Sequence, residues 1–178
     1  MNKNKLLKMI LSALFLALAY VMPFLTGQVP QIGSMLCPMH IPILLCGFIC
    51  GWRWGLGVGF FAPLLRSVTL GAPYLFPNAV CMALELAAYG AIAGLLYKLL
   101  PKKKINIYAS LLGAMVLGRI IYGISMASCM GVAGKAYAFS AFIASALTGA
   151  IPGIIIQIIL IPILVMAIKS RRGLKLND

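Results

Sequence analysis

Two ionisable side chains, Glu85 and Arg119, stand inside long apolar runs of this chain, and their opposite charges indicate an ion pair or a site for a polar ligand. Each depth is counted from the end of the run on one shared side of the predicted bundle, at about 1.5 Å per helical residue. Glu85 then lies ~13 Å deep and Arg119 ~10 Å deep, so the two side chains could meet. Ionisable groups inside apolar helices are costly to bury and therefore predict function. An ion pair that only holds two helices together is the alternative.

Further polar, aromatic and thioether side chains surround these two at helical spacing. On the run that carries Glu85, this spacing places Asn78, Met82 and Tyr89 on the same helix face. The residues predicted to line one ligand-binding cup are His40, Arg66, Tyr74, Asn78, Met82, Glu85, Arg119 and Tyr122. Arginine binds carboxylates through paired donors, so two arginines favour a small amphipathic ligand with a carboxylate. Gln157 lies deeper and is predicted to form a hydrogen bond between helices.

The composition argues against enzymatic and metal chemistry. The chain has 1 histidine and 2 acidic residues, too few for a Ser/His/Asp triad or a zinc-hydrolase motif. No GxxxxGK[ST] phosphate-binding loop occurs, so nucleotide hydrolysis by that route is not expected. Cys46 and Cys50 are spaced i, i+4, but nothing nearby completes a tetrahedral metal site, and the 5 cysteines are predicted to pack as small apolar residues. We therefore expect no enzyme, no cofactor and no metal.

The elements that must position the cup are apolar runs, which occupy most of a chain that is 63% hydrophobic. Runs of about 20 apolar residues are long enough to cross a bilayer as helices. Six spans are predicted, at about 6–25, 40–51, 55–70, 76–99, 105–127 and 139–168. The second is too short to cross about 30 Å of hydrocarbon unaided, so it is expected to be a tilted helix buried by its neighbours, or a re-entrant segment. The predicted fold is an all-α integral membrane protein, with residues 1–178 as a single domain.

Most of the basic residues fall in alternate gaps between these spans, and Arg66 and Lys135 are the exceptions on the opposite side. The basic residues number 15, against 2 acidic residues, and most of them gather before the first span, at residues 52–54, at residues 102–104 and after the last span. Lysine and arginine favour the cytoplasmic side of a membrane, so both termini are predicted to be cytoplasmic and the cup to be external. A net charge of +13 at the bilayer edges indicates contact with anionic membrane lipid and no binding of nucleic acid.

Small residues recur every four positions, a spacing that lets membrane helices approach closely. The glycines at this spacing are Gly47, Gly51, Gly55, Gly59, Gly90 and Gly94. These are predicted to serve internal helix packing. In the first span Ala13 and Ala17 have the same spacing, which fits either an internal contact or a patch that docks a partner.

The combination of these features resembles the substrate-binding S components of energy-coupling factor (ECF) transporters. The resemblance rests on size, six spans, basic character, the Ala-x-x-x-Ala pair of the first span, and three segments. These segments are residues 39–51, Pro63–Ser67 followed by Gly71–Tyr74, and Met82–Gly90. In that family the S component captures a vitamin outside the cell and topples within the membrane against a T component, which two cytoplasmic ATPases drive. The resemblance covers essentially the whole chain.

The resemblance implies roles for several parts of the chain. Ala13 and Ala17 would contact the T component, the pocket would lie mainly in spans four to six, and residues 26–39 would act as a lid. The expected function is high-affinity capture of a water-soluble vitamin or related micronutrient at the plasma membrane of a prokaryote. The two arginines and the histidine of the cup favour an anionic vitamin, with pantothenate first, while folate and other vitamins stay open.

Two other classes of protein remain open from the residues alone. A self-sufficient carrier or channel for small solutes, acting as a homo-oligomer, would take up solute into liposomes without partners. A membrane enzyme or assembly factor is a third class, and the shortage of acids and histidine disfavours it.

Overall fold

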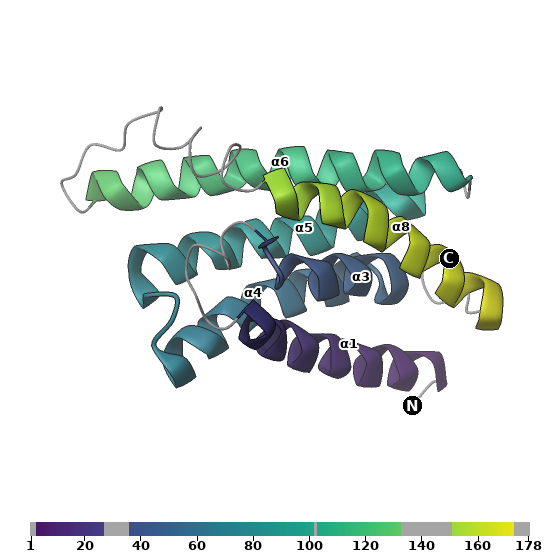
Figure 1. Cartoon of the computed structure of the whole chain (residues 1–178), viewed down its shortest axis with the longest axis horizontal. Helices are drawn as coiled ribbons and strands as arrows, with labels where there is room; N and C mark the ends of the chain where they lie inside the picture. Colours follow the sequence, from purple (N-terminus) through teal and green to yellow (C-terminus); the bar gives the residue numbers. More distant parts are fainter. Residues whose placement is uncertain (1–2, 27–35, 102, 133–150, 173–178) are drawn as a thin grey trace.

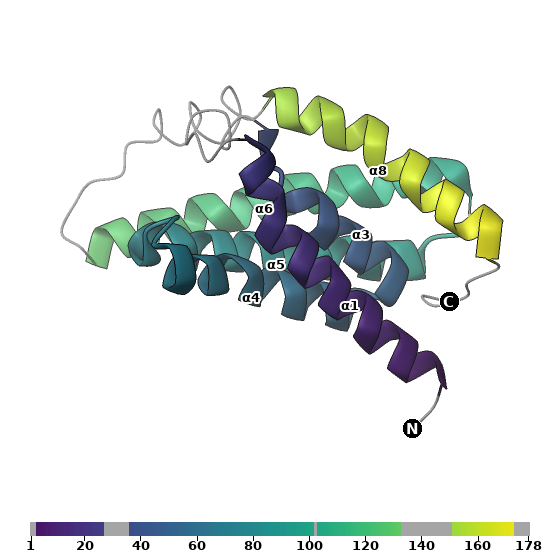
Figure 2. The same ribbon diagram turned by 60° about the horizontal axis from the view of Figure 1, so that its bottom comes forward.

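The computed structural model describes residues 3–26, 36–101, 103–132 and 151–172, which form a bundle of helices with no strand among them (Figure 1). The helices are α1 (Lys3–Val21), η1 (Met22–Thr26), α3 (His40–Cys50), α4 (Trp52–Leu70), η2 (Leu75–Ala79), α5 (Val80–Leu99), α6 (Lys104–Val132) and α8 (Ile151–Arg172). Successive α-helices run in alternate directions, so the start of α1 and the end of α8 lie at the same end of the bundle (Figures 1 and 2).

Four stretches of the described chain are long and apolar enough to cross a membrane. They are Lys3–Phe24, Leu75–Leu99, Lys104–Gly131 and Ile151–Ile168. These match the predicted first, fourth, fifth and sixth spans, although residues 139–150 of the sixth lie outside the described chain. α4 covers the predicted third span with 19 residues. The described chain is therefore all-helical, as predicted, and four of its stretches have the length and composition of membrane spans. The count of six spans and the cytoplasmic position of both termini stay predictions.

The short second span is a helix that its neighbours enclose. α3 has 11 residues, about 16 Å of helix at 1.5 Å per residue, and all of them are buried. It contacts α1, α4, α5 and α8. α5 lies next to it and also contacts α4 and α6, so α3 and α5 form the centre of the bundle, and α1 covers α3 and α4 from one side (Figure 2). The expectation of a short helix buried by its neighbours is confirmed.

The connection between α3 and α4 is tighter than predicted. Gly51 alone makes the turn, with φ 104°, a conformation that side chains disfavour, and α4 begins at Trp52. The Trp52–Trp54 segment was expected to be a turn outside the helices, and that expectation was wrong. One glycine suffices because its backbone reverses the chain without extra residues. At the other end of α4, Gly71 with φ 68° ends the helix, in the gap between the predicted third and fourth spans.

A glycine seam brings α4 against α5 and α3 so closely that backbone meets backbone. A Cβ added at Gly90 would meet the carbonyl of Gly55 and come within 2.9 Å of its Cα. The other members of the seam, with similarly close backbone neighbours, are Gly47, Gly59 and Gly94. The prediction that these glycines serve internal packing is confirmed, and the seam fixes the position of α5, which carries Glu85.

Candidate functional site

A cluster of ionisable side chains lies buried in the bundle where α3, α5 and α6 meet. Glu85 of α5 and Arg119 of α6 form an ion pair, with Oε1 3.0 Å from Nη1. His40, the first residue of α3, places its Nε2 3.7 Å from the same carboxylate oxygen. Glu85 is 2% exposed, His40 4% and Arg119 15%. The depths predicted from the sequence for Glu85 and Arg119 thus do bring the two side chains together.

Two neighbouring side chains complete this cluster. The Arg119 guanidinium donates through Nη2 to the Sγ of Cys37, at 3.7 Å, and the Cys37 carbonyl accepts the backbone N–H of His40 at 3.1 Å. The ring of Tyr89 meets the His40 ring edge-on, with centroids 5.0 Å apart. We call Cys37, His40, Glu85, Tyr89 and Arg119 the polar cluster.

Residue spacing on α5 and a glycine on α6 position the side chains of the polar cluster. Glu85 and Tyr89 are four residues apart on α5 and so share one face. On α6, Gly118 precedes Arg119 and leaves room for the Tyr89 ring, because a Cβ there would come within 3.1 Å of ring carbons. The glycine thus allows the tyrosine to pack against α6 directly beside the residue that pairs with Glu85.

The polar cluster has hydrogen-bonding groups that its own members do not satisfy. Both ring nitrogens of His40 and the Nε of Arg119 are buried without a hydrogen-bond partner within the described chain. Oε1 of Glu85 is also without a hydrogen bond, so its contact with Arg119 is an ion pair that lacks hydrogen-bond alignment. Buried polar groups are nearly always hydrogen-bonded, and each exception calls for an explanation, such as a ligand.

The remaining predicted cup residues separate into near and distant ones. Met82 lies on α5 one turn before Glu85, and Tyr122 lies on α6 one turn after Arg119; both are half-buried. Asn78 and Tyr74 are exposed. Of the predicted cup, the structure therefore brings His40, Glu85 and Arg119 together. It keeps Met82 and Tyr122 beside them, and it leaves Tyr74 and Asn78 at the surface.

Arg66 is the predicted cup residue that lies elsewhere. Its guanidinium donates through Nη1 to the carbonyl oxygen of Tyr20 at 3.0 Å and stacks over the ring of Phe24, 5.1 Å from the centroid. The physical reason is that the last carbonyls of α1 lack partners within the helix and carry partial negative charge. The Tyr20 hydroxyl also lies 3.0 Å from the Thr69 hydroxyl, so Arg66 and Thr69 both join α4 to the end of α1.

Two members of the polar cluster were absent from the predicted cup. Tyr89 shares the helix face of Glu85, so its spacing was a usable signal. Cys37 gave none, because it was interpreted as a small apolar residue and its place beside Arg119 depends on how the chain enters α3. Its φ of 47° is unusual for a residue with a side chain. Gln157 is buried on α8, and its Oε1 has no hydrogen-bond partner among the described residues.

The two alanines singled out in the first span lie on the outside of the bundle. Ala13 and Ala17 are exposed on α1, and so are their apolar neighbours Leu14 and Leu18. Ser12 and Phe15 face inward instead. The alanines thus do not pack within the described part of this chain.

Comparison with known proteins gives one finding. A family model described as the substrate-specific component of ECF transporters matches residues 7–166. The match runs from early in α1 to near the end of α8 and includes the polar cluster and both exposed alanines. No curated protein and no solved structure gives a significant match.

Proposed function

The chain belongs to the substrate-specific components of ECF transporters, and from this premise we propose that the polar cluster is where it binds its substrate, a water-soluble vitamin or related micronutrient. The unsatisfied groups around Glu85 and Arg119 support the proposal. An ion pair that only joined α5 to α6 would need no third ionisable residue. His40 nevertheless lies 3.7 Å from Glu85 with both ring nitrogens lacking a hydrogen bond. A polar ligand would supply the missing partners.

The chemistry of the polar cluster restricts the substrate. Arg119 can donate only, a charged Glu85 can accept only, and the His40 ring can do either. A complementary ligand carries an acceptor such as a carboxylate together with hydroxyl or amide donors. Because Arg66 binds the end of α1, a single guanidinium is present, which suits one carboxylate and not two. Pantothenate has one carboxylate, an amide and two hydroxyl groups, and it is the first substrate to test.

Exposure indicates the side from which a substrate would arrive. Arg119 is the most exposed of the three ionisable residues, at 15% against 4% or less for His40 and Glu85. The carboxylate of a ligand would meet the Arg119 guanidinium first. The donor groups of the ligand would then reach the Glu85 carboxylate and the His40 imidazole. Most of the lid expected at residues 26–39 lies outside the described residues, and the lid remains a proposal from the family.

The outer surface of α1 supports coupling to partners. Exposed Ala13 and Ala17 form a shallow strip between larger apolar side chains, against which another membrane helix could pack closely. We assign this strip to the T component, with two cytoplasmic ATPases supplying the energy and toppling of this chain delivering the substrate inward. The site of action would be the plasma membrane of a prokaryote.

Native mass spectrometry of the purified chain tests the substrate directly, since a co-purified ligand is identified by its mass. Titration with pantothenate follows, comparing the wild type with Arg119→Gln and with Arg53→Gln as a control that removes an arginine far from the polar cluster. We expect binding to be lost only in Arg119→Gln. Equal binding by both variants would place the substrate elsewhere.

Liposome uptake separates an S component from a self-sufficient carrier. The chain alone should bind substrate without sustained uptake, and adding the T component and ATPases with ATP should start uptake. Uptake by the chain alone would favour the carrier.

A further inference from the structure

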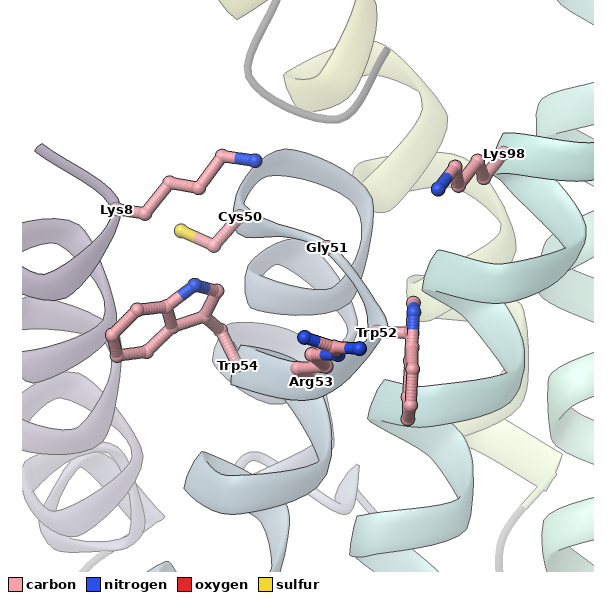
Figure 3. Close-up of a pocket in the computed structure, with 7 residues that line it drawn as sticks. All are labelled: Lys8, Cys50, Gly51, Trp52, Arg53, Trp54 and Lys98. Carbon is pink, nitrogen blue, oxygen red and sulfur yellow. The ribbon is translucent and has the colours of Figure 1, made fainter. Parts of the chain in front are cut away.

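A second candidate site lies at the basic end of the bundle, away from the polar cluster. It is a cavity of ≈ 390 Å³ lined by Lys8 of α1, residues 50–54 around the start of α4, and Lys98 near the end of α5 (Figure 3). Its volume falls within the range of small-molecule sites. No member of the polar cluster lines it.

Three cations from three helices surround this cavity without a counter-charge. Lys8, Arg53 and Lys98 line it, and no acidic residue does. The only acidic residue in the described chain is Glu85, which pairs with Arg119. Figure 3 shows the Lys8 and Lys98 side chains extending from opposite sides towards the turn at Gly51. Like charges that converge on one cavity repel each other, and an anion between them removes that repulsion.

The start of α4 adds to the positive potential of the cavity. This helix has 19 residues and begins at Trp52 without a side-chain cap. The first N–H groups of a helix lack partners within it and carry partial positive charge, which favours phosphate groups. The three cations and the uncapped helix end thus all select an anion.

The surroundings of the cavity indicate that the anion belongs to a lipid. Trp52 and Trp54 are half-buried beside it, and the Arg53 guanidinium lies 5.2 Å from the centre of a Trp52 ring. Tryptophan beside arginine is typical of the level of lipid headgroups. One turn further into the bundle, Leu56 of α4 and Leu95 of α5 are exposed, so they offer apolar surface to acyl chains.

We propose that this basic cavity binds the phosphate headgroup of an anionic phospholipid from the leaflet that faces the cytoplasm. Lys8, Arg53 and Lys98 neutralise the phosphate, the start of α4 donates N–H groups to it, and the acyl chains lie along the exposed leucines. This proposal depends on the predicted membrane orientation of the chain, and it does not depend on which substrate the chain binds.

Tryptophan fluorescence gives a local readout, because the chain has 2 tryptophans and both line the cavity. The full chain is reconstituted in phosphatidylcholine vesicles with a small fraction of brominated lipid, which quenches tryptophan on contact. Brominated phosphatidylglycerol should quench much more strongly than brominated phosphatidylcholine at the same fraction. Equal quenching by the two lipids would overturn the proposal without any variant.

Matched variants distinguish lipid binding in this cavity from a general attraction of anionic lipid to the basic end of the bundle. Lys98→Gln should lower the preference for phosphatidylglycerol about fivefold, the effect of one basic residue near a membrane surface. Lys5→Gln removes an exposed cation at the same end of the bundle but outside the cavity, and should leave the preference unchanged. Equal losses in both variants would show diffuse attraction and overturn the site.

A soluble competitor distinguishes the source of the phosphate. Millimolar glycerol 3-phosphate carries the same phosphate group without acyl chains and should leave the quenching by brominated phosphatidylglycerol in place. If it abolishes the quenching, the cavity binds soluble phosphates and the lipid proposal is wrong.

Discussion

Replacing Gly59 with alanine should push α4 away from α5 and destabilise the bundle. A Cβ at this position would meet the carbonyl group of Leu86 and lie 2.7 Å from the backbone nitrogen of Ala87. All of these atoms belong to the backbone of α5. A side chain could rotate away from the new methyl group, but a helix backbone can yield only by moving the whole helix.

The magnitude follows from two opposing effects. Overfilling a packed interior costs about 1–3 kcal/mol, and the rigid backbone contacts at Gly59 favour the upper end, about 3 kcal/mol. Alanine is favoured over glycine within a helix by about 1 kcal/mol, so the net loss is about 2 kcal/mol. Each kcal/mol shifts the Tm of a chain of this size by about 2–4 °C, so Gly59→Ala should lower the Tm by about 4–8 °C.

Gly57 provides the matched control on the same helix. A Cβ there has no neighbour within 4 Å, so Gly57→Ala should keep or slightly raise the Tm. Unfolding in detergent can be followed with a thiol-reactive dye, because the thiols of Cys46, Cys50 and Cys81 are buried in the folded chain. Equal Tm values for the two alanine variants would refute the reasoning that the glycine seam is closed backbone to backbone.

Three further predictions concern the polar cluster and the outer face of α1. Arg119→Ala leaves Glu85 buried without its counter-charge and should destabilise the chain by about 3–5 kcal/mol. The double variant Glu85→Ala/Arg119→Ala should recover most of that stability. It should still fail to bind substrate in calorimetry. Substrate binding by the double variant would show that the pair is structural. His40→Leu keeps a side chain of similar size beside Tyr89 and should weaken substrate binding about five- to tenfold, the loss of one hydrogen bond, with little change in Tm; unchanged affinity would remove the histidine from the site. Ala13→Leu should abolish uptake by the assembled transporter without changing substrate affinity, and a loss of affinity would contradict its assignment to coupling.

The sequence carried enough information to predict most of the described helices and one buried ion pair. Apolar run lengths predicted the described helices to within a few residues at most ends. Counting residues along the fourth and fifth spans placed Glu85 and Arg119 at matching depths, and the two side chains pair at 3.0 Å. Depth is predictable because the helical rise is constant.

The partners of long or isolated side chains were harder to predict. Arg66 was assigned to the cup because it lies near the correct end of its helix, yet it donates to the carbonyl oxygen of Tyr20 at the end of α1 instead. Cys37 joins the polar cluster through the path of the backbone into α3, which no periodicity reports. The Trp52–Trp54 segment joined α4 because Gly51 turns the chain alone. In each case a tertiary contact or a single glycine decided the outcome.

The shortness of α3 has a consequence for how the chain is made. Its 11 residues are about half the length that a helix needs to cross the hydrocarbon layer independently. A single glycine joins it to α4, so we expect the two to enter the bilayer as one hairpin during synthesis, and α3 to reach its final depth only when α5 encloses it. A chain truncated after α4 should therefore leave Cys46 and Cys50 accessible to a water-soluble thiol reagent, whereas a chain extended beyond α5 should protect them.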